Sequence, residues 1–287
     1  MRLFLFVGLS LLSSQLWSQE PASLGKPLKV IDSIPGPESI AVGPDGAWYV
    51  SSFGKFDNGA DGAVYRVEPD KGTRERYAGG LEDPCGVVFV GNTLWVADRK
   101  GVYRVTRGKA ELVYPAGNFP RPLHFLNDLA ADASGKLYVS DTGDSTSHGA
   151  VFVLVTGQRP SVLSGSDTAA GSTSANGLFR GGEDTLYVVG YHSGTLSMTD
   201  GHGSWKTLAN GLGAPDGLEF AQGNAFYVSD NQGGDLFRVS RGGGKSVKLA
   251  AGLQAPADLV VDRGRGLLIV PENAGNRLSV YRLKSGG

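Results

Sequence analysis

Apolar and polar positions recur along the chain in a phrase that appears six times. Each copy opens with a polar or small residue, runs through an apolar strand and a tight turn, and reaches a second apolar strand. The copies begin at Glu38, Cys85, Asn127, Asn176, Asp216 and Ala257. The spacings between these starts are 47, 42, 49, 40 and 41 residues. Self-similarity at a nearly fixed period predicts a repeat protein.

The length of the repeat predicts a β-propeller, whose blades each contain four short strands. A third strand follows each pair, as at 63–67 and 235–239, and a fourth follows the third, as at 74–78 and 246–250. Helical periodicity is absent after the first residues, which disfavours α/β folds. We therefore expect an all-β fold, a six-bladed β-propeller with four strands in each blade.

The two ends of the chain indicate how the ring closes. The sixth repeat ends after its third strand, at 278–283, and lacks a fourth. An isolated strand, Leu28–Ile34, precedes the first repeat. We expect this N-terminal strand to complete the last blade, because a radial array of sheets must leave no exposed edges.

The first residues have the charge order of an export signal. Arg2 is followed by the apolar run 3–12 and then by small and polar residues up to Gln19. The run is too short to span a membrane. We expect residues 1–19 to be a signal peptide and residues 20–287 to form one propeller domain, exported to the periplasm or secreted. A buried N-terminal strand is the alternative.

Composition narrows the classes of partner. The 287 residues include 44 glycines, which fits many tight turns, and carry a net charge of −1. This charge gives no indication of nucleic-acid or membrane binding. Cys85 is the one cysteine, so no internal disulfide can form. We expect a monomer that acts on a small molecule.

The loops predict which face of the propeller is functional. Loops that join second to third strands, and one blade to the next, lie on one face and are long, as at 51–62 and 142–149. Long loops on a rigid scaffold commonly carry binding residues. His124, His148 and His192 fall on this face, and His202 falls on the other. Asp98, Asp141 and Asp230 end second strands, where we expect them to bond loop amides.

The residues that begin the six phrases occupy equivalent places where inner strands surround the axis. Glu38, Asn127, Asn176 and Asp216 are oxygen donors. Two carboxylates and two amides suit a hard cation such as Ca²⁺. Asn-Gly and Asp-Gly are also ordinary turn sequences, which is an alternative for Asn176 and Asp216. That alternative does not explain Glu38.

These motifs resemble the regucalcin, gluconolactonase and luciferin-regenerating-enzyme family. The family pattern places a glutamate in the first blade, Asn-Asp in the third, Asn-Gly in the fourth and Pro-Asp-Gly in the fifth. The matching segments are Glu38, Asn127-Asp128, Asn176-Gly177 and Pro215-Asp216-Gly217, in the same order. The resemblance implies a six-bladed propeller with a divalent metal, Ca²⁺ above all, on its axis. It also implies that Asp216 is both a metal ligand and the general base.

One departure from the family bears on the substrate. Family lactonases carry an arginine two residues before the third-blade asparagine, and this chain has Phe125 there. Phe125 and Tyr191 favour a more apolar lactone or ester than a sugar lactone. We expect Phe125, His124, Tyr191 and His192 to contact the substrate.

Two functions follow from the sequence. The first is a metal-dependent hydrolase of a lactone or related ester. The second is a non-catalytic propeller that binds a ligand or protein on its long-loop face, with a metal that only stabilises the fold.

Overall fold

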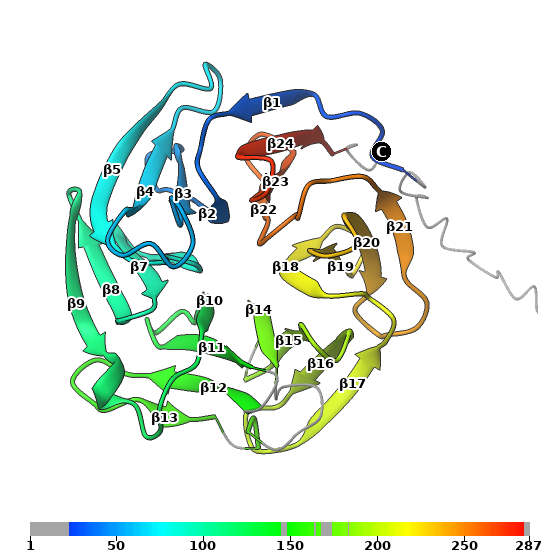
Figure 1. Cartoon of the computed structure of the whole chain (residues 1–287). Helices are drawn as coiled ribbons and strands as arrows, with labels where there is room; N and C mark the ends of the chain where they lie inside the picture. The colour runs from blue at the N-terminus through cyan, green and yellow to red at the C-terminus, as the bar shows by residue number, and fades with distance from the viewer. Residues whose placement is uncertain (1–22, 145–147, 164, 168–173, 183, 284–287) are drawn as a thin grey trace, which may run out of the picture.

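The strands of the molecule stand in a ring around a central axis (Figure 1). The structure, a computed structural model, describes residues 23–144, 148–163, 165–167, 174–182 and 184–283, so the predicted signal peptide lies outside the described residues. Within these residues the strands form six four-stranded antiparallel sheets, which confirms the six-bladed propeller. No helix in this part of the chain is long and apolar enough to cross a membrane.

Each blade is a run of consecutive strands ordered from the axis outward. The first blade contains β2 (Pro37–Val42), β3 (Trp48–Ser52), β4 (Gly62–Val67) and β5 (Arg74–Leu81). The second contains β6 (Val87–Val90), β7 (Thr93–Asp98), β8 (Gly101–Thr106) and β9 (Lys109–Pro115), followed by the short 3-10 helix η1 (Ala116–Asn118). The third contains β10 (Leu126–Ala131), β11 (Leu137–Gly143), β12 (His148–Leu154) and β13 (Ser161–Val162).

The second half of the ring repeats this order. The fourth blade contains β14 (Ala175–Arg180), β15 (Leu186–Gly190), β16 (Thr195–Thr199) and β17 (Trp205–Ala209). The fifth contains β18 (Pro215–Ala221), β19 (Ala225–Asp230), β20 (Asp235–Ser240) and β21 (Val247–Ala250). The sixth contains β22 (Val260–Asp262), β23 (Leu267–Glu272), β24 (Arg277–Arg282) and β1 (Lys29–Asp32).

The sixth blade joins the two ends of the described chain. Strand β1 pairs antiparallel with β24 in the register Lys29 to Val280 and Asp32 to Arg277. Figure 1 shows β1 along the outer side of β24. The predicted closure by the N-terminal strand is confirmed, with a shorter strand than the expected Leu28–Ile34. Strand β1 thereby covers the outer edge of β24 and completes the sixth four-stranded sheet.

The core of the described chain consists of six apolar clusters, one between each pair of neighbouring blades. Side chains alternate across a strand, so each sheet packs one face on the preceding blade and the other on the next. Between the sixth and first blades, fully buried Trp48 donates its indole N–H to Asp262 Oδ2 at 2.9 Å.

A one-residue bulge interrupts four inner strands at the start of the repeated phrase. In β2, Pro37 pairs with Ser52 and Ile40 with Val50, so three steps on the inner strand match two on its partner. The same shift occurs in β10, β14 and β18. A bulge leaves an extra residue out of the ladder and redirects the side chains beside it. The redirected residues include Glu38, Asn127, Asn176 and Asp216.

Buried serines on the second strands satisfy the backbone of three of these bulges. In each, a serine Oγ accepts a hydrogen bond from the N–H of the second bulge residue. The donor and acceptor pairs are Ser39 with Ser51, Asp128 with Ser140 and Gly217 with Ser229, at 2.9, 2.8 and 2.8 Å. The bulges are therefore hydrogen-bonded features of the fold and hold their side chains in fixed directions.

Carboxylates at the ends of second strands hold the loops that lead into inner strands. Asp141 Oδ1 accepts from Phe125 N–H at 2.8 Å, and Asp230 Oδ1 accepts from Ala214 N–H at 2.9 Å. Equivalent bonds run to Asp98 from Glu82 N–H and to Glu272 from Gln254 N–H. The structural role predicted for Asp98, Asp141 and Asp230 is confirmed, and these bonds fix where the axial residues stand.

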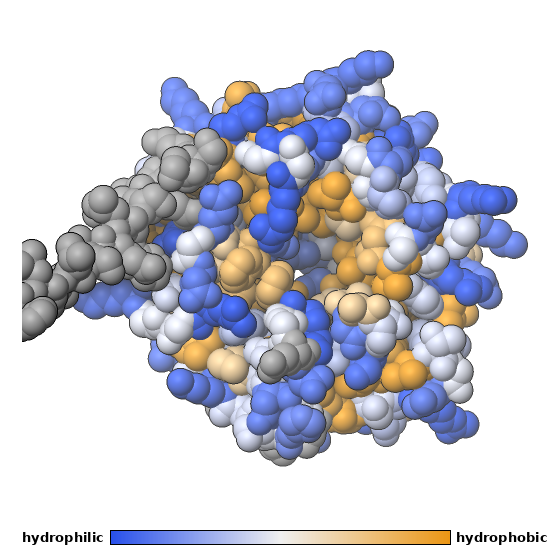
Figure 2. All heavy atoms as spheres, turned by 180° about the vertical axis from the view of Figure 1, so that it is seen from behind, coloured by the Kyte–Doolittle hydropathy of each residue, from blue (hydrophilic) through white to orange (hydrophobic). Residues whose placement is uncertain are grey.

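The far ends of the inner strands make an apolar hollow on the opposite face. Figure 2 shows apolar side chains gathered around the central opening of that face. The cavity there has a volume of about 390 Å³ and is lined by residues such as Val88, Leu129 and Val261. Charged residues, among them Arg180, Glu219 and Arg263, also contribute to this lining.

Replacing Ser229 by alanine should destabilise the fold. Ser229 Oγ accepts from Gly217 N–H and donates to Ala257 O at 2.8 Å, and its removal leaves both backbone groups buried and unpaired. The expected loss is about 1–3 kcal/mol in the free energy of unfolding, measured by urea denaturation. Ser161→Ala, on exposed strand β13, is the control and should change it by less than about 0.5 kcal/mol. Equal losses in both variants would contradict the role of the bulge.

Candidate functional site

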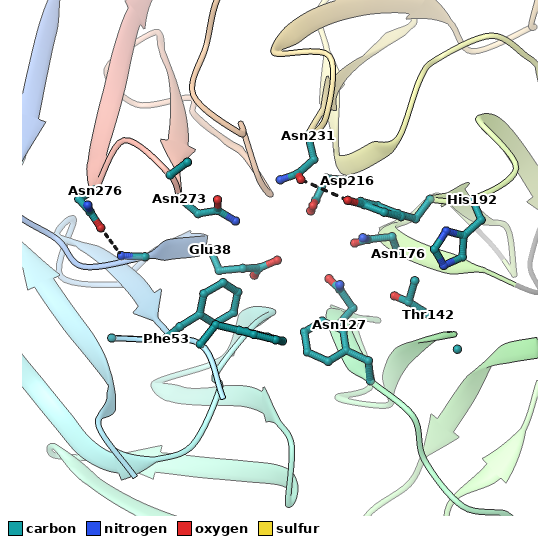
Figure 3. A pocket seen from close by; sticks show the side chains of 17 residues that line it. Glu38, Phe53, Asn127, Thr142, Asn176, His192, Asp216, Asn231, Asn273 and Asn276 are labelled. Atoms are coloured by element: carbon teal, nitrogen blue, oxygen red, sulfur yellow. Dashed lines mark hydrogen bonds between the residues drawn. The ribbon is translucent and has the colours of Figure 1, made fainter. Parts of the chain in front are cut away.

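Four oxygen-bearing side chains converge at one end of the axis. Glu38, Asn127, Asn176 and Asp216 come from β2, β10, β14 and β18, in four different blades. Figure 3 shows their ends directed toward a common centre. Their exposed fractions are 3%, 5%, 2% and 5%, so all four are removed from bulk water. The structure brings together the four residues that the sequence predicts as one cluster.

Each of these side chains has a buried oxygen that accepts no hydrogen bond within the described residues. The atoms are Glu38 Oε2, Asn127 Oδ1, Asn176 Oδ1 and Asp216 Oδ1. A buried oxygen without a donor costs about 1–3 kcal/mol, and folded proteins keep few of them. Four in one cluster fit a hard cation, because carboxylate and amide oxygens are the ligands that Ca²⁺ prefers.

The cluster does not have the composition of a transition-metal site. No group of three or more His, Cys, Asp and Glu side chains within the described ranges could hold a metal ion. The axial cluster contains two such residues, and its other two donors are amides. The remaining positions of the ring are Cys85 and Ala257, both fully buried. Burial, with the charge of Glu38 as the next cause, raises the pKa of the Cys85 thiol well above its ordinary value.

Two more carboxylates lie one residue further along the inner strands. Asp128 accepts hydrogen bonds from the N–H groups of Leu129 and Leu178, at 2.6 and 2.7 Å. Asp258 accepts from Ser39 Oγ at 2.6 Å and from Leu259 N–H at 2.8 Å. Unlike the four residues of the cluster, both aspartates therefore have donors for their oxygens.

The charged side chains that are buried among the described residues are all carboxylates, and those of Glu38, Asp128, Asp216 and Asp258 lie close together on the axis. Burial, followed by the charges of Asp216, Asp258 and Asp128, raises the pKa of Glu38 well above its ordinary value. Burial and the charge of Asp258 do the same for Asp216 and Asp128. For Asp258, burial raises the pKa to about 6, although Ser39 donates to it. A bound cation would favour the ionised forms of these carboxylates, which burial disfavours.

A cavity of about 590 Å³ lies over the cluster. Five residues of its wall occupy the same position in five blades. In each blade the first paired residue of the innermost segment has a partner on the second strand, and the wall residue directly follows that partner. The five residues are Phe53, Thr142, Tyr191, Asn231 and Asn273. Thr142 donates to Ala175 O at 3.0 Å, and Tyr191 donates to Asn231 Oδ1 at 3.2 Å. The wall is thus bonded across neighbouring blades.

Most of the predicted site residues line this cavity. Glu38, Asn127, Asn176 and Asp216 are joined there by Phe125, Tyr191 and His192. His124 is not part of the lining, and its Nδ1 lies 3.3 Å from Asp144 Oδ2. The side chain of His148 lies outside the described residues.

The cavity also contains residues that the sequence alone did not single out. They are Gly36, Phe53, Gly54, Phe56, Thr142, Gly143, Asn231, Asn273, Ala274 and Asn276. Four of them occupy equivalent positions in the repeat, because each directly follows the last residues of a second strand. They are Phe53 after Ser52, Thr142 after Asp141, Asn231 after Asp230 and Asn273 after Glu272. Aligning those strand ends, as well as the phrase starts, would have found this second layer of the site.

Comparisons with known proteins relate this architecture to enzymes. A gluconolactonase from Xanthomonas campestris superimposes with a TM-score of 0.69 and 19% identity, over 92% of this chain and 92% of that chain. A streptogramin B lyase gives a TM-score of 0.62 and 13% identity over 90% and 86% of the two chains. Virginiamycin B lyase from Staphylococcus aureus gives a TM-score of 0.62 and 12% identity, over 89% of this chain and 99% of that chain. No family model and no curated protein sequence matches the chain.

These similarities establish the fold. The resemblance to the gluconolactonase family inferred from the four motifs is confirmed at the level of the fold. The chain is a six-bladed propeller of the type on which a gluconolactonase and streptogramin B lyases are built. At these identities the fold is shared, and the chemistry has to be argued from the residues of this chain.

The stability of the metal-free protein should fall as pH rises. An acid whose pKa is raised on folding binds more protons in the folded state, so its stabilising contribution is lost between the unfolded and folded pKa values. For Asp258 this interval runs from 3.8 to about 6 and corresponds to about 3 kcal/mol. Calorimetry in metal-free buffer should give a lower melting temperature at pH 7 than at pH 5.

Asp258→Asn should reduce this pH dependence, because the side chain no longer titrates. Asp70→Asn, at a carboxylate that is 91% exposed, is the matched control and should leave the dependence unchanged. If both variants keep the full decrease between pH 5 and pH 7, Asp258 is not its source.

Proposed function

We propose that the protein is a metal-dependent hydrolase of a lactone or related ester, with Ca²⁺ as its metal. The observation that carries this proposal is the set of four buried oxygens without donors at the floor of a cavity large enough for a small molecule. The fold shared with a gluconolactonase is consistent with it. The export predicted from residues 1–19 and a monomeric state belong to the same proposal.

Glu38, Asn127, Asn176 and Asp216 would hold the cation. Their two negative charges match a dication, and their mutual repulsion, with that of Asp128 and Asp258, is relieved by it. When bound, such a cation supplies Lewis-acid polarisation of a carbonyl oxygen and stabilises the charge that develops on it.

Asp216 would act as the general base. Its carboxylate would accept a proton from the attacking water while the water oxygen bonds to the carbonyl carbon. The acyl C–O bond then breaks, and the proton returns to the departing alkoxide. In a lactone the alcohol and acid so formed belong to one molecule. His192, which also lines the cavity, is a second side chain that could accept the proton.

The lining favours a substrate without strong negative charge. Within the described residues it contains neither lysine nor arginine, and Phe125 stands where family lactonases have an arginine. Phe125, Tyr191 and His192 would contact the substrate. His124 would act only through its neighbours, since it is not in the lining.

The same absence of a cationic side chain supports a second candidate function. A propeller that only binds would use the metal to hold its inner strands together and the long-loop face to capture a ligand or protein. Hydrolysis of lactones and aryl esters, assayed with and without a chelator, separates the two functions.

Calcium should stabilise the folded protein. A ligand that binds only the folded state adds about 2.7 kcal/mol at a concentration one hundred times its Kd. The melting temperature should therefore rise with Ca²⁺ and return on chelation. Glu38→Gln and Asn176→Ala should each weaken the response, whereas Asp70→Asn should preserve it. A full calcium response in both cluster variants would place the metal elsewhere.

Asp216→Asn should abolish turnover. Asparagine keeps the shape and one oxygen of aspartate but cannot accept the proton, so hydrolysis should fall by about 10²–10⁴-fold even at saturating metal. A cation beside Asp216 lowers its pKa, so the unmodified enzyme should gain activity with pH along a single limb. The measurements are kcat and its pH profile, with calcium-dependent melting as the check on metal binding. Full activity in the variant would exclude Asp216 as the base.

A further inference from the structure

An aromatic cluster forms one wall of the cavity. The ring centroids of Phe53 and Phe56 are 5.4 Å apart at an interplanar angle of 74°, and those of Phe56 and Phe125 are 5.8 Å apart at 59°. All three residues line the cavity. Phe56 is 53% exposed, one of the few large apolar side chains in the described chain with so much surface in water. An exposed phenylalanine at a cavity mouth is a surface that a ligand can cover.

The loop that carries Phe56 is held in place from the second blade. Arg99 bonds Asp57 Oδ1 at 2.6 Å and Asp83 Oδ2 at 2.8 Å. Asp57 N–H also donates to Asp83 Oδ1 at 3.0 Å, and Asp83 is buried. The guanidinium carbon of Arg99 lies 5.7 Å from the centre of the Phe56 ring. A two-sided ion pair and a cation–π contact therefore fix the position of Phe56.

The same loop is also ordered from within. Asp61 Oδ2 accepts from Lys55 N–H and from Asn58 Nδ2, both at 3.1 Å. Gly54 has a φ of +72°, and a Cβ there would come within 2.9 Å of the Asp61 carboxylate. A side chain at position 54 would displace this turn. The aromatic wall is thus preformed, which lowers the entropy cost of binding a ligand against it.

The opposite side of the cavity has a different chemistry. Asn231, Asn273 and Asn276 supply amides there, and Figure 3 shows Phe53 and Asn273 on opposite sides of Glu38. Two of these amides have fixed orientations. Asn231 Oδ1 accepts from Tyr191, and Asn276 Oδ1 accepts from Gly36 N–H at 2.8 Å. The cation cluster therefore lies between an apolar wall and a hydrogen-bonding wall.

We propose that Phe53, Phe56 and Phe125 form a subsite for an aromatic ring, and that the substrates are lactones or esters with an aryl substituent on one side of the carbonyl. This inference rests on the proposed hydrolase function for the carbonyl chemistry, although the subsite itself is a property of the aromatic wall. Edge-to-face contacts between a bound ring and these side chains favour an aromatic group over a saturated one of equal size. Arg99 is a positioning residue that acts through Phe56.

The kinetic test compares three γ-lactones that differ only in a substituent on a saturated ring carbon: phenyl, cyclohexyl or methyl. The unmodified protein should give a kcat/KM for the phenyl lactone on the order of tenfold above that for the methyl lactone, because burial of the ring is added. The kcat/KM for the cyclohexyl lactone should lie between these two values. In Phe56→Leu the kcat/KM values for the phenyl and cyclohexyl lactones should become similar, and in Phe56→Ala both should approach the value for the methyl lactone.

Two further variants test the wall and its support. Arg99→Ala should raise KM for the phenyl lactone with little change in kcat, and Arg99→Lys should restore part of the loss. Leu112→Ala, an exposed apolar residue on the outer strand β9, is the control and should leave all three rates unchanged. Melting temperatures of all variants confirm that they are folded.

A second measurement separates this proposal from the hydrolase proposal. Saturation-transfer NMR with 3-phenyltetrahydrofuran, which has the ring but no carbonyl to hydrolyse, reports binding alone. Binding that is lost in Phe56→Ala supports the subsite even if no lactone is hydrolysed. Hydrolysis of all three lactones at equal rates, or binding of the probe that is unchanged in Phe56→Ala, would overturn the subsite and leave the hydrolase proposal standing.

Discussion

The structure depends on keeping polar oxygens buried where six inner strands approach one another. Glu38, Asn127, Asn176 and Asp216 each present an oxygen without a donor to the same point on the axis. Burying carboxylates and amides in this way is unfavourable unless something compensates for the lost water. The same cost acts on the neighbouring aspartates, because burial raises the pKa of Asp128 and of Asp258. This unfavourable burial at the centre of the fold is the reason that we propose a cation there.

The propeller supplies the rigidity that this arrangement needs. Apolar clusters between neighbouring blades stabilise the ring, and β1 closes it against β24. In four of the blades a bulge directs the axial residue, and buried serines such as Ser140 and Ser229 hold bulges in shape. Carboxylates such as Asp141 hold the incoming loops. Hydrogen bonds therefore position the polar ends of the inner strands, and apolar side chains pack between neighbouring blades.

The repeat made much of this predictable from the sequence. The phrase starts predicted the six blades and the four axial donors, and the isolated strand near the N-terminus predicted the closure. The cavity walls were harder to predict, because their residues come from loops whose paths no periodicity determines. Phe56 lies within the loop 53–61, and its position depends on Arg99 from another blade. Position in the sequence also did not distinguish His124 from His192: the side chain of His124 lies beside Asp144, whereas His192 lines the cavity.

The contrast between the two walls bears on how one fold can serve different substrates. The inner strands carry the axial donors, and the bulges fix the directions in which those side chains point. The side chains of Phe53, Phe56 and Asn273 line the cavity from loops outside the inner strands and their bulges. Phe125 belongs to the aromatic wall, and Asn127, two residues away, belongs to the bulge of β10. Under the proposed function the rim would therefore set the substrate preference while the axis supplies the chemistry, and the aromatic wall would express that preference in this chain.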